Sequence, residues 1–290
     1  MIDRPHRSCL YLPGAKPRVL EKAKTLAADT LIFDLEDSVL PEQKDAAREA
    51  VAETISKGGY GTRARIIRVN GADTSWFEAD LNMAARSGAH GVLVPKVESA
   101  ADIRNLSTQL NDAGAPADFG LWVMVETPRI LLDLGAIADI GASTRLGALV
   151  LGTNDLAKAL GARNTPDRLA FLTALALTVA AARSCGCLAI DTVYNDYGDD
   201  AGLRAECEQG RTLGFDGKTL IHPAQITAAN EIYGPSAAEI EEAEQIIAAF
   251  DAPENEGVGV LTVRGKMVER LHLEQARALL AKASAIARLA

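Results

Sequence analysis

Two stretches of this sequence decide the fold that we predict for it: Val123-Met124-Val125-Glu126-Thr127-Pro128 and Val150-Leu151-Gly152-Thr153-Asn154-Asp155-Leu156. Each begins with a short run of apolar and β-branched residues, reaches a carboxylate, and continues into a turn and a helical pattern. Such a run is typical of a buried parallel strand that delivers a side chain to the edge of a sheet. The sequence therefore predicts that Glu126 and Asp155 lie at the ends of neighbouring strands.

The same alternation of strand and helix patterns recurs along the chain. Strand-like runs lie at 8–12, 30–35, 65–69, 91–97, 121–125, 148–152, 188–193 and 218–221. Helical spacing lies between them at 17–28, 44–57, 76–87, 100–113, 128–140, 166–184 and 201–213. Gly88, Gly114, Gly186 and Gly214 follow helical runs, as expected of left-handed helix ends. Eight strands alternating with helices predict a parallel (β/α)8 TIM barrel, and the absence of a G-x-G-x-x-G after the first strand disfavours a doubly wound sheet.

The domain organisation that we expect is a barrel followed by a tail. Residues 1–234 would form the TIM-barrel catalytic domain and residues 235–290 a C-terminal lid segment. The tail carries helical patterns at 237–250 and 272–289 and a strand pattern at 258–263. It exceeds what a barrel needs, so we interpret it as a cover on the barrel or as a lid over the mouth of the same or a neighbouring subunit.

Composition excludes several classes of function. The 290 residues are 48% hydrophobic and 24% charged, which is typical of a globular protein. A formal charge of −9 argues against general binding to nucleic acid or an anionic membrane. The longest apolar segment, 169–182, is too short to span a bilayer, and the first residues lack the apolar core of a signal peptide. We therefore expect a cytoplasmic setting.

The cysteines and histidines predict neither a disulfide framework nor a zinc site. Cys9, Cys185, Cys187 and Cys207 lack paired CxxC spacing, and the four histidines lack the helical i, i+4 spacing of zinc ligands. We interpret the cysteines as buried or incidental thiols.

Two carboxylates at neighbouring strand ends indicate a metal site. In a TIM barrel, Glu126 and Asp155 would face the C-terminal mouth, where the active site lies. Two carboxylates with room for water and substrate oxygens suit Mg²⁺, with Mn²⁺ as the alternative ion. The competing interpretation is that each carboxylate caps the helix that follows it.

Other charged residues also follow predicted strands. Glu36 and Asp37 would support the metal through bound waters, although Asp37 could instead cap a helix. Arg68 either neutralises these acids or binds a substrate carboxylate through its planar fork, and we favour the second role. Lys96 adds a second cation, whose alternative role is a salt bridge within the ring of charges.

Seven motifs, spread in order over nearly the whole chain, resemble the CoA-ester lyases of the citrate lyase beta subunit superfamily, also called the HpcH/HpaI aldolase superfamily. These motifs are RSCLYLPG at 7–14, FDLEDSV at 33–39, RVN at 68–70, PKVE at 95–98, ETP at 126–128, GTNDL at 152–156 and DGKTLIHP at 216–223. That group includes malyl-CoA, methylmalyl-CoA and citramalyl-CoA lyases and a malyl-CoA thioesterase.

The resemblance implies a Mg²⁺-dependent barrel that assembles as a homotrimer or hexamer and acts on a CoA thioester and a 2-ketoacid. It implies that Glu126 and Asp155 bind the metal, with Asp155 also facing the substrate. It assigns the ketoacid to Arg68, and the acyl or CoA part to Arg7 and Lys16.

The tail departs from the family pattern at one position. The family commonly has Gly-Lys-Met-Ile-Asp-x-Pro, in which the aspartate acts as acid or base across a subunit boundary. Here Glu269 stands in its place, within Gly265-Lys266-Met267-Val268-Glu269-Arg270-Leu271. A displacement of about 1 Å in a catalytic group can cost on the order of a hundredfold in rate, so the extra methylene puts the reaction type in doubt.

The reaction that we expect is carbon–carbon cleavage or formation of a 3-hydroxyacyl-CoA such as malyl-CoA, giving acetyl-CoA and glyoxylate. Arg68 would stabilise the oxygen that becomes the ketoacid carbonyl, and Glu269 would exchange a proton with the acetyl carbon. The alternatives are a malyl-CoA thioesterase on the same scaffold and a citrate lyase beta subunit that takes its acyl group from a carrier protein. Retention of Glu126, Asp155 and Arg68 disfavours a barrel without catalysis.

Overall fold

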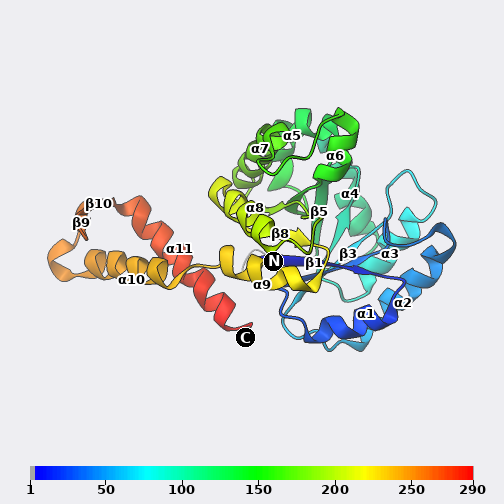
Figure 1. Cartoon of the computed structure of the whole chain (residues 1–290), viewed down its shortest axis with the longest axis horizontal. Helices are drawn as coiled ribbons and strands as arrows, with labels where there is room; N and C mark the ends of the chain where they lie inside the picture. Colours follow the sequence, from blue (N-terminus) through cyan, green and yellow to red (C-terminus); the bar gives the residue numbers. More distant parts are fainter. Residues whose placement is uncertain (1–3, 290) are drawn as a thin grey trace. The chain divides into compact units, whose positions relative to one another are not determined.

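The computed structural model describes residues 4–289, which divide into two compact units. Among these residues, one unit comprises His6–Tyr233, and the second comprises residues 4–5 and 234–289. Within the first unit, eight parallel strands close into a barrel (Figure 1). The strands are β1 (Ser8–Pro13), β2 (Thr30–Asp34), β3 (Ala64–Arg68), β4 (Gly91–Val94), β5 (Gly120–Val125), β6 (Leu146–Leu151), β7 (Leu188–Asp191) and β8 (Gly217–Leu220). The predicted (β/α)8 TIM barrel is therefore confirmed.

Helices alternate with the strands and cover the outside of the barrel (Figure 1). They are α1 (Pro17–Lys22), α2 (Lys44–Lys57), α3 (Phe77–Arg86), α4 (Ala100–Asp112), α5 (Pro128–Gly141), α6 (Thr153–Leu160), α7 (Leu172–Ser184), α8 (Asp200–Leu213) and α9 (Ile226–Ile232). The helix predicted from residue 166 begins only at Leu172, because Arg168 has a φ of 53°, which a right-handed helix does not accept. The four glycines predicted to end helices all have positive φ.

Alternation along each strand separates two apolar layers. One set of side chains fills the barrel interior: Cys9, Ile32, Ile66, Leu93, Trp122, Met124, Ala148, Val150, Leu188 and Ile190. The opposite set packs between the strands and the surrounding helices. The interior is thus a packed core and not a pore, and Trp122 is fully buried in it. Polar chemistry is accordingly expected at the ends of the strands.

The second unit folds around a small apolar core of its own. It consists of α10 (Ala237–Asp251), the antiparallel strands β9 (Val260–Val263) and β10 (Lys266–Glu269), and α11 (Arg270–Ala287). Val268, Leu273 and Phe250 are buried between these elements. Arg264 and Gly265 both have positive φ, which is the backbone that a tight hairpin turn requires. Strand β10 was not predicted, because Val268 is its single buried residue.

The helices of residues 4–289 include none with the length and apolar character needed to cross a membrane.

Candidate active site

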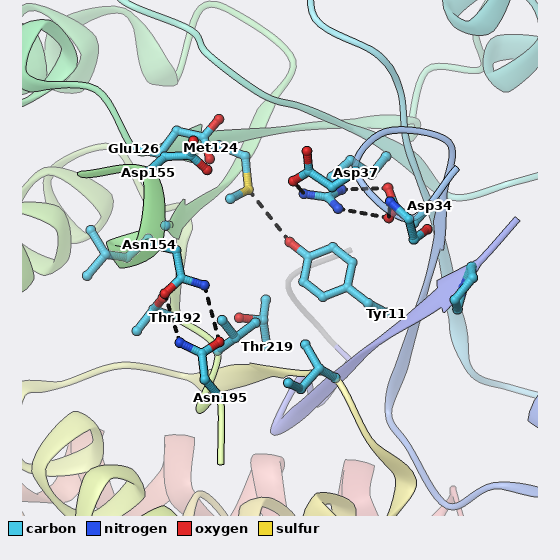
Figure 2. A pocket seen from close by; sticks show the side chains of 17 residues that line it. Tyr11, Asp34, Asp37, Met124, Glu126, Asn154, Asp155, Thr192, Asn195 and Thr219 are labelled. Atoms are coloured by element: carbon cyan, nitrogen blue, oxygen red, sulfur yellow. Dashed lines mark hydrogen bonds and ion pairs between the residues drawn. The ribbon is translucent and has the colours of Figure 1, made fainter. Parts of the chain in front are cut away.

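A pocket of about 340 Å³ opens at the C-terminal ends of the barrel strands (Figure 2). Its lining includes Tyr11, Asp34, Arg68, Glu126 and Asp155. Strand alternation explains this set, because Asp34 and Arg68 follow the inward-facing Ile32 and Ile66 by two residues. Figure 2 shows Glu126 and Asp155 on one side of the pocket and Asp34 and Asp37 on the other.

The guanidinium of Arg68 makes hydrogen bonds and ion pairs along its edge and stacks on an aromatic ring with its face. Its Nε and Nη2 donate to the two carboxylate oxygens of Asp34 at 2.7 and 2.8 Å. Its Nη1 lies 2.9 Å from Glu36 Oε2 and 3.4 Å from Asp37 Oδ2. The guanidinium also lies over the ring of Tyr11, with Cζ 4.7 Å from the ring centre. Arg68 is thus a rigid cation whose Nη1 side remains turned toward the acids of the pocket.

Asp34 is the partner that sequence reasoning missed. The bidentate carboxylate that we expected Arg68 to take from a substrate is supplied by Asp34, which lies directly across from it in the β2–β3 register. Although burial opposes ionisation, Arg68 holds the pKa of Asp34 below its ordinary value. The sequence contains the information needed to find it. Asp34 follows the inward-facing Ile32 by two residues, so strand alternation places both side chains on the inner face of β2.

Glu36 is a nearly buried carboxylate with an altered affinity for protons. Its burial raises the pKa to about 7, although Arg68 and Lys96 oppose the change. Asp37 is far more exposed, with a side chain 66% accessible. The two acids predicted to support the site therefore occupy different environments, and both contact Arg68.

Lys96 connects the acids on the two sides of the pocket. Its backbone N–H donates to Glu126 Oε1 at 2.8 Å, and its Nζ lies 3.5 Å from Asp155 Oδ1 and 3.8 Å from Glu36 Oε1. Its φ of 55° is rare for a residue with a side chain and aims the N–H at Glu126. The surrounding structure therefore holds the Lys96 backbone in this unfavourable conformation.

Glu126 and Asp155 fit the oxygen donors of a magnesium site. Burial raises the pKa of Glu126, and the nearby Asp155 adds to the effect, so a cation between them would relieve repulsion. Gly152 makes room for the carboxylate, because a Cβ there would lie 2.9 Å from Glu126 Oε2. Within residues 4–289, no three His, Cys, Asp or Glu side chains gather to hold a metal. Two carboxylates completed by water and substrate are the set that Mg²⁺ accepts.

An amide pair spans another part of the rim. Asn154 and Asn195 exchange two side-chain hydrogen bonds, at 3.2 and 2.9 Å (Figure 2). Thr192, which also lines the pocket, accepts through Oγ1 from the backbone N–H of Thr153, the first residue of α6. These residues line or adjoin the pocket, and sequence reasoning did not single them out, because amides and hydroxyls at loop positions are common everywhere.

Two residues predicted to hold substrate lie elsewhere in the barrel unit. Arg7 precedes β1, at the end opposite the pocket, and its Nε and Nη2 donate to Asp29 at 2.8 Å each. Lys16 is exposed on the pocket side, immediately before α1. The structure therefore brings Arg68, Glu126, Asp155, Glu36, Asp37 and Lys96 into one network of contacts, and Arg7 and Lys16 lie apart from it.

Glu269 ends β10 in the second unit. Its exposed side chain accepts from the backbone N–H of His272, and His272 Nδ1 accepts from the Glu269 N–H at 2.9 Å. Glu269 therefore forms a reciprocal cap at the start of α11.

Comparison with known proteins identifies the family. Residues 7–223 match the family described as HpcH/HpaI aldolase/citrate lyase. The (3S)-malyl-CoA thioesterase of Cereibacter sphaeroides is 52% identical over 283 residues, covering 98% of this chain and 96% of the relative. Citrate lyase subunit beta of Escherichia coli is 35% identical over 285 residues, covering 97% and 94%.

A solved structure gives the same result. The protein CitE from Mycobacterium tuberculosis, in complex with magnesium, acetoacetate and coenzyme A, is similar with a TM-score of 0.75 and 29% identity. The similarity covers 97% of this chain and 99% of CitE. The resemblance inferred from the motifs is confirmed, and this chain belongs to the HpcH/HpaI aldolase/citrate lyase family.

Proposed function

We propose that this chain hydrolyses the thioester of a malyl-CoA-type 3-hydroxyacyl-CoA and releases CoA and the free hydroxy acid. The observation that carries the proposal is 52% identity, over almost the full length of both chains, with a (3S)-malyl-CoA thioesterase. Sequence reasoning alone favoured carbon–carbon cleavage with hydrolysis as the alternative. The relative supports the alternative better than the first choice.

The pocket suits the acyl end of such a substrate. A volume of about 340 Å³ accommodates a short hydroxy dicarboxylate, whereas the much larger CoA would extend out of the mouth. Glu126 and Asp155 would hold Mg²⁺, or Mn²⁺ in its place, which when bound polarises substrate oxygens. Arg68 Nη1 and the first turn of α6 offer positive charge and N–H donors to the substrate carboxylate.

Hydrolysis requires a base that takes a proton from water. We assign this role to Glu269, whose exposed carboxylate is the counterpart of the family's catalytic aspartate. Water would lose its proton to a Glu269 carboxylate oxygen as it adds to the thioester carbonyl carbon. The carbon–sulfur bond would then break, and the departing CoA thiolate would take the proton back from Glu269 and leave as a thiol.

The direct test is product analysis with malyl-CoA and Mg²⁺. We expect free thiol and malate to appear together, without glyoxylate. Asp155→Asn should abolish this activity while the protein keeps its melting temperature, whereas Asp118→Asn, an exposed aspartate in the loop before β5, should behave as wild type. Glyoxylate without thiol would overturn the proposal, and full activity of Asp155→Asn would overturn the metal assignment.

Carbon–carbon cleavage is the second candidate. It is favoured by 35% identity with citrate lyase subunit beta and by the similarity to a CitE structure that holds acetoacetate and coenzyme A. On this scaffold Arg68 would stabilise the oxygen that becomes the ketoacid carbonyl. If neither malate nor glyoxylate forms from malyl-CoA, then citryl-, citramalyl- and methylmalyl-thioesters, including those on a carrier protein, are the next substrates to test.

Two further proposals concern organisation. We propose that residues 1–234 act as the catalytic barrel and residues 235–290 as a lid. We also propose a homotrimer or hexamer, which sedimentation velocity on the purified protein would distinguish from a monomer.

A further inference from the structure

Two cysteines meet at the junction of α7 and β7. Cys185 is the residue at the end of α7, and Cys187 directly precedes β7. Their sulfur atoms lie 3.2 Å apart, and both residues are free thiols. Gly186 between them has a φ of 71°, and this left-handed turn brings the two side chains to the same side of the chain. The local backbone conformation therefore places the two sulfur atoms in contact.

The two thiols differ in exposure. Cys185 is partly exposed and packs on Gly141, where a Cβ would lie 2.3 Å from the Cys185 Cβ. Cys187 is buried, and its thiol donates to the carbonyl of Leu146 at 3.1 Å. Cys185 is thus the more accessible residue of the pair, and the Cys187 sulfur lies within contact distance of its sulfur.

The contact also makes the thiols chemically unequal. The sulfur–sulfur contact with Cys187 lowers the pKa of Cys185, so its thiolate forms more readily than in an ordinary cysteine. The hydrogen bond to Cys185, together with burial, raises the pKa of Cys187. A partly exposed cysteine with raised thiolate content beside a second thiol is the arrangement of a peroxide-sensitive pair.

The other two cysteines provide a contrast within the same molecule. Cys9 and Cys207 are fully buried. Burial raises the pKa of both thiols, which keeps them protonated and unreactive.

We propose that Cys185 and Cys187 form a reversible intramolecular disulfide when the protein meets hydrogen peroxide. The Cys185 thiolate attacks one peroxide oxygen, so that a sulfur–oxygen bond forms, the oxygen–oxygen bond breaks, and the departing hydroxide takes up a proton as water. The Cys187 sulfur then attacks the sulfenic sulfur of Cys185 and displaces the second oxygen as water. In sum, two thiols lose two electrons and two protons to one peroxide, which yields two waters.

This modification site is separate from the proposed active site. The pair precedes β7, whereas the pocket lies beyond the opposite, C-terminal ends of the strands. The partly exposed position of Cys185 leaves the disulfide open to attack by a thiol reductant, which would restore both cysteines. The inference therefore does not depend on which reaction the pocket catalyses.

The test uses the full-length protein, treated with a small excess of hydrogen peroxide and then unfolded and alkylated. We expect Cys9 and Cys207 to be alkylated, the peptide containing Cys185-Gly186-Cys187 to lack two hydrogens, and dithiothreitol to restore alkylation at all four cysteines. Cys185→Ser and Cys187→Ser should each lose the modification, whereas Cys207→Ser should keep it. Melting temperatures of the variants check that each one is folded.

Several outcomes would overturn the proposal. Alkylation of all four cysteines after peroxide treatment would show that the pair does not react. A sulfinic acid on Cys185 without a link, or a disulfide that involves Cys207 or a second molecule, would show that Cys187 does not resolve the oxidised sulfur. Each outcome is read from the wild-type protein alone, so none depends on a variant folding.

Discussion

Arg68 is buried at the centre of the pocket, and its three acidic neighbours differ sharply in how they hold it. Asp34 is almost fully buried and uses both oxygens, whereas Asp37 is exposed and meets one nitrogen at 3.4 Å. A buried ion pair is costly to break from one side, because the remaining charge loses its partner. Exposed pairs contribute little, because water screens them.

Replacement of these two aspartates should therefore have unequal effects. Asp34→Ala should lower the free energy of unfolding by about 3 kcal/mol, because Arg68 would keep only its Nη1 partners. Asp37→Ala should lower it by less than about 1 kcal/mol. Urea unfolding of both variants measures the difference, and equal losses would contradict the assignment of Asp34 as the main support of Arg68.

Glu36 should make stability depend on pH in a defined direction. Burial raises its pKa from an ordinary 4.5 to about 7, so the folded state binds the proton more tightly than the unfolded state. The stabilisation by the protonated form is complete below pH 4.5 and is lost as pH rises to about 7. In metal-free buffer, Glu36→Gln should become more stable than wild type above that window, by on the order of 3 kcal/mol.

The control for this prediction is Glu42→Gln. Glu42 is exposed and, like Glu36, lies in the segment that follows the C-terminal end of β2. Its stability should follow that of wild type at every pH. Parallel curves for wild type and Glu36→Gln between pH 4.5 and 8 would show that Glu36 does not carry the raised pKa.

At the scale of elements, the turn from β6 into α6 shapes the proposed metal site. A methyl group at Gly152 would lie 2.8 Å from Glu126 Cβ and 2.9 Å from its Oε2, both closer than normal contact. Gly152→Ala should push the carboxylate aside and weaken Mg²⁺ binding by on the order of tenfold, since a poorly placed ligand loses most of its interaction. Calorimetric titration with Mg²⁺ measures this change.

Gly135→Ala is the matched control, because a Cβ at this position in α5 meets no atom within 4 Å. Alanine is the better helix former, so this variant should be more stable by up to about 1 kcal/mol and should bind Mg²⁺ unchanged. Equal Mg²⁺ affinities for Gly152→Ala and wild type would argue against the proposed ligand role of Glu126.

The elements also show what could be predicted from sequence. The eight strands were found within one to three residues of their observed bounds, because buried parallel strands leave continuous apolar runs and glycines end the helices. Strand β10 escaped, because it buries Val268 alone. A helix was expected after the second carboxylate but without bounds, and the structure places it at Thr153–Leu160, where it begins at the site itself.

The pocket was predictable in part for a related reason. Glu126 and Asp155 stand at strand ends that the topology makes neighbours, so their position followed from chain order. The Asp34–Arg68 pair and the strained backbone of Lys96 depend on register and on a φ angle, which no single stretch of sequence reveals. Arg7 illustrates the converse, since a motif residue at the start of a strand lies away from the pocket.

At the scale of the whole molecule, the proposed function requires Glu269 to be more than a helix cap. Glu269→Gln retains a hydrogen-bonding side chain at the start of α11 but removes the base. Thioester hydrolysis should then fall by at least about a hundredfold, with substrate binding largely unchanged. Glu274→Gln, an exposed position on the same helix, should keep full activity. Normal turnover by Glu269→Gln would make the tail structural.

A subunit-mixing experiment extends this prediction to the assembly. If the tail acts on a neighbouring subunit, an unfolded and refolded mixture of Asp155→Asn and Glu269→Gln chains should regain part of the activity that each variant lacks. A mixture as inactive as its components would indicate that each tail serves its own barrel.

The fate of malyl-CoA in ¹⁸O-labelled water, with Mg²⁺ present, separates hydrolysis from carbon–carbon cleavage in one experiment. We predict one free thiol for each malate formed, one labelled oxygen in the new carboxylate, and no glyoxylate. Glyoxylate and acetyl-CoA in equal amounts, with no free thiol, would contradict hydrolysis and assign the chain to carbon–carbon cleavage.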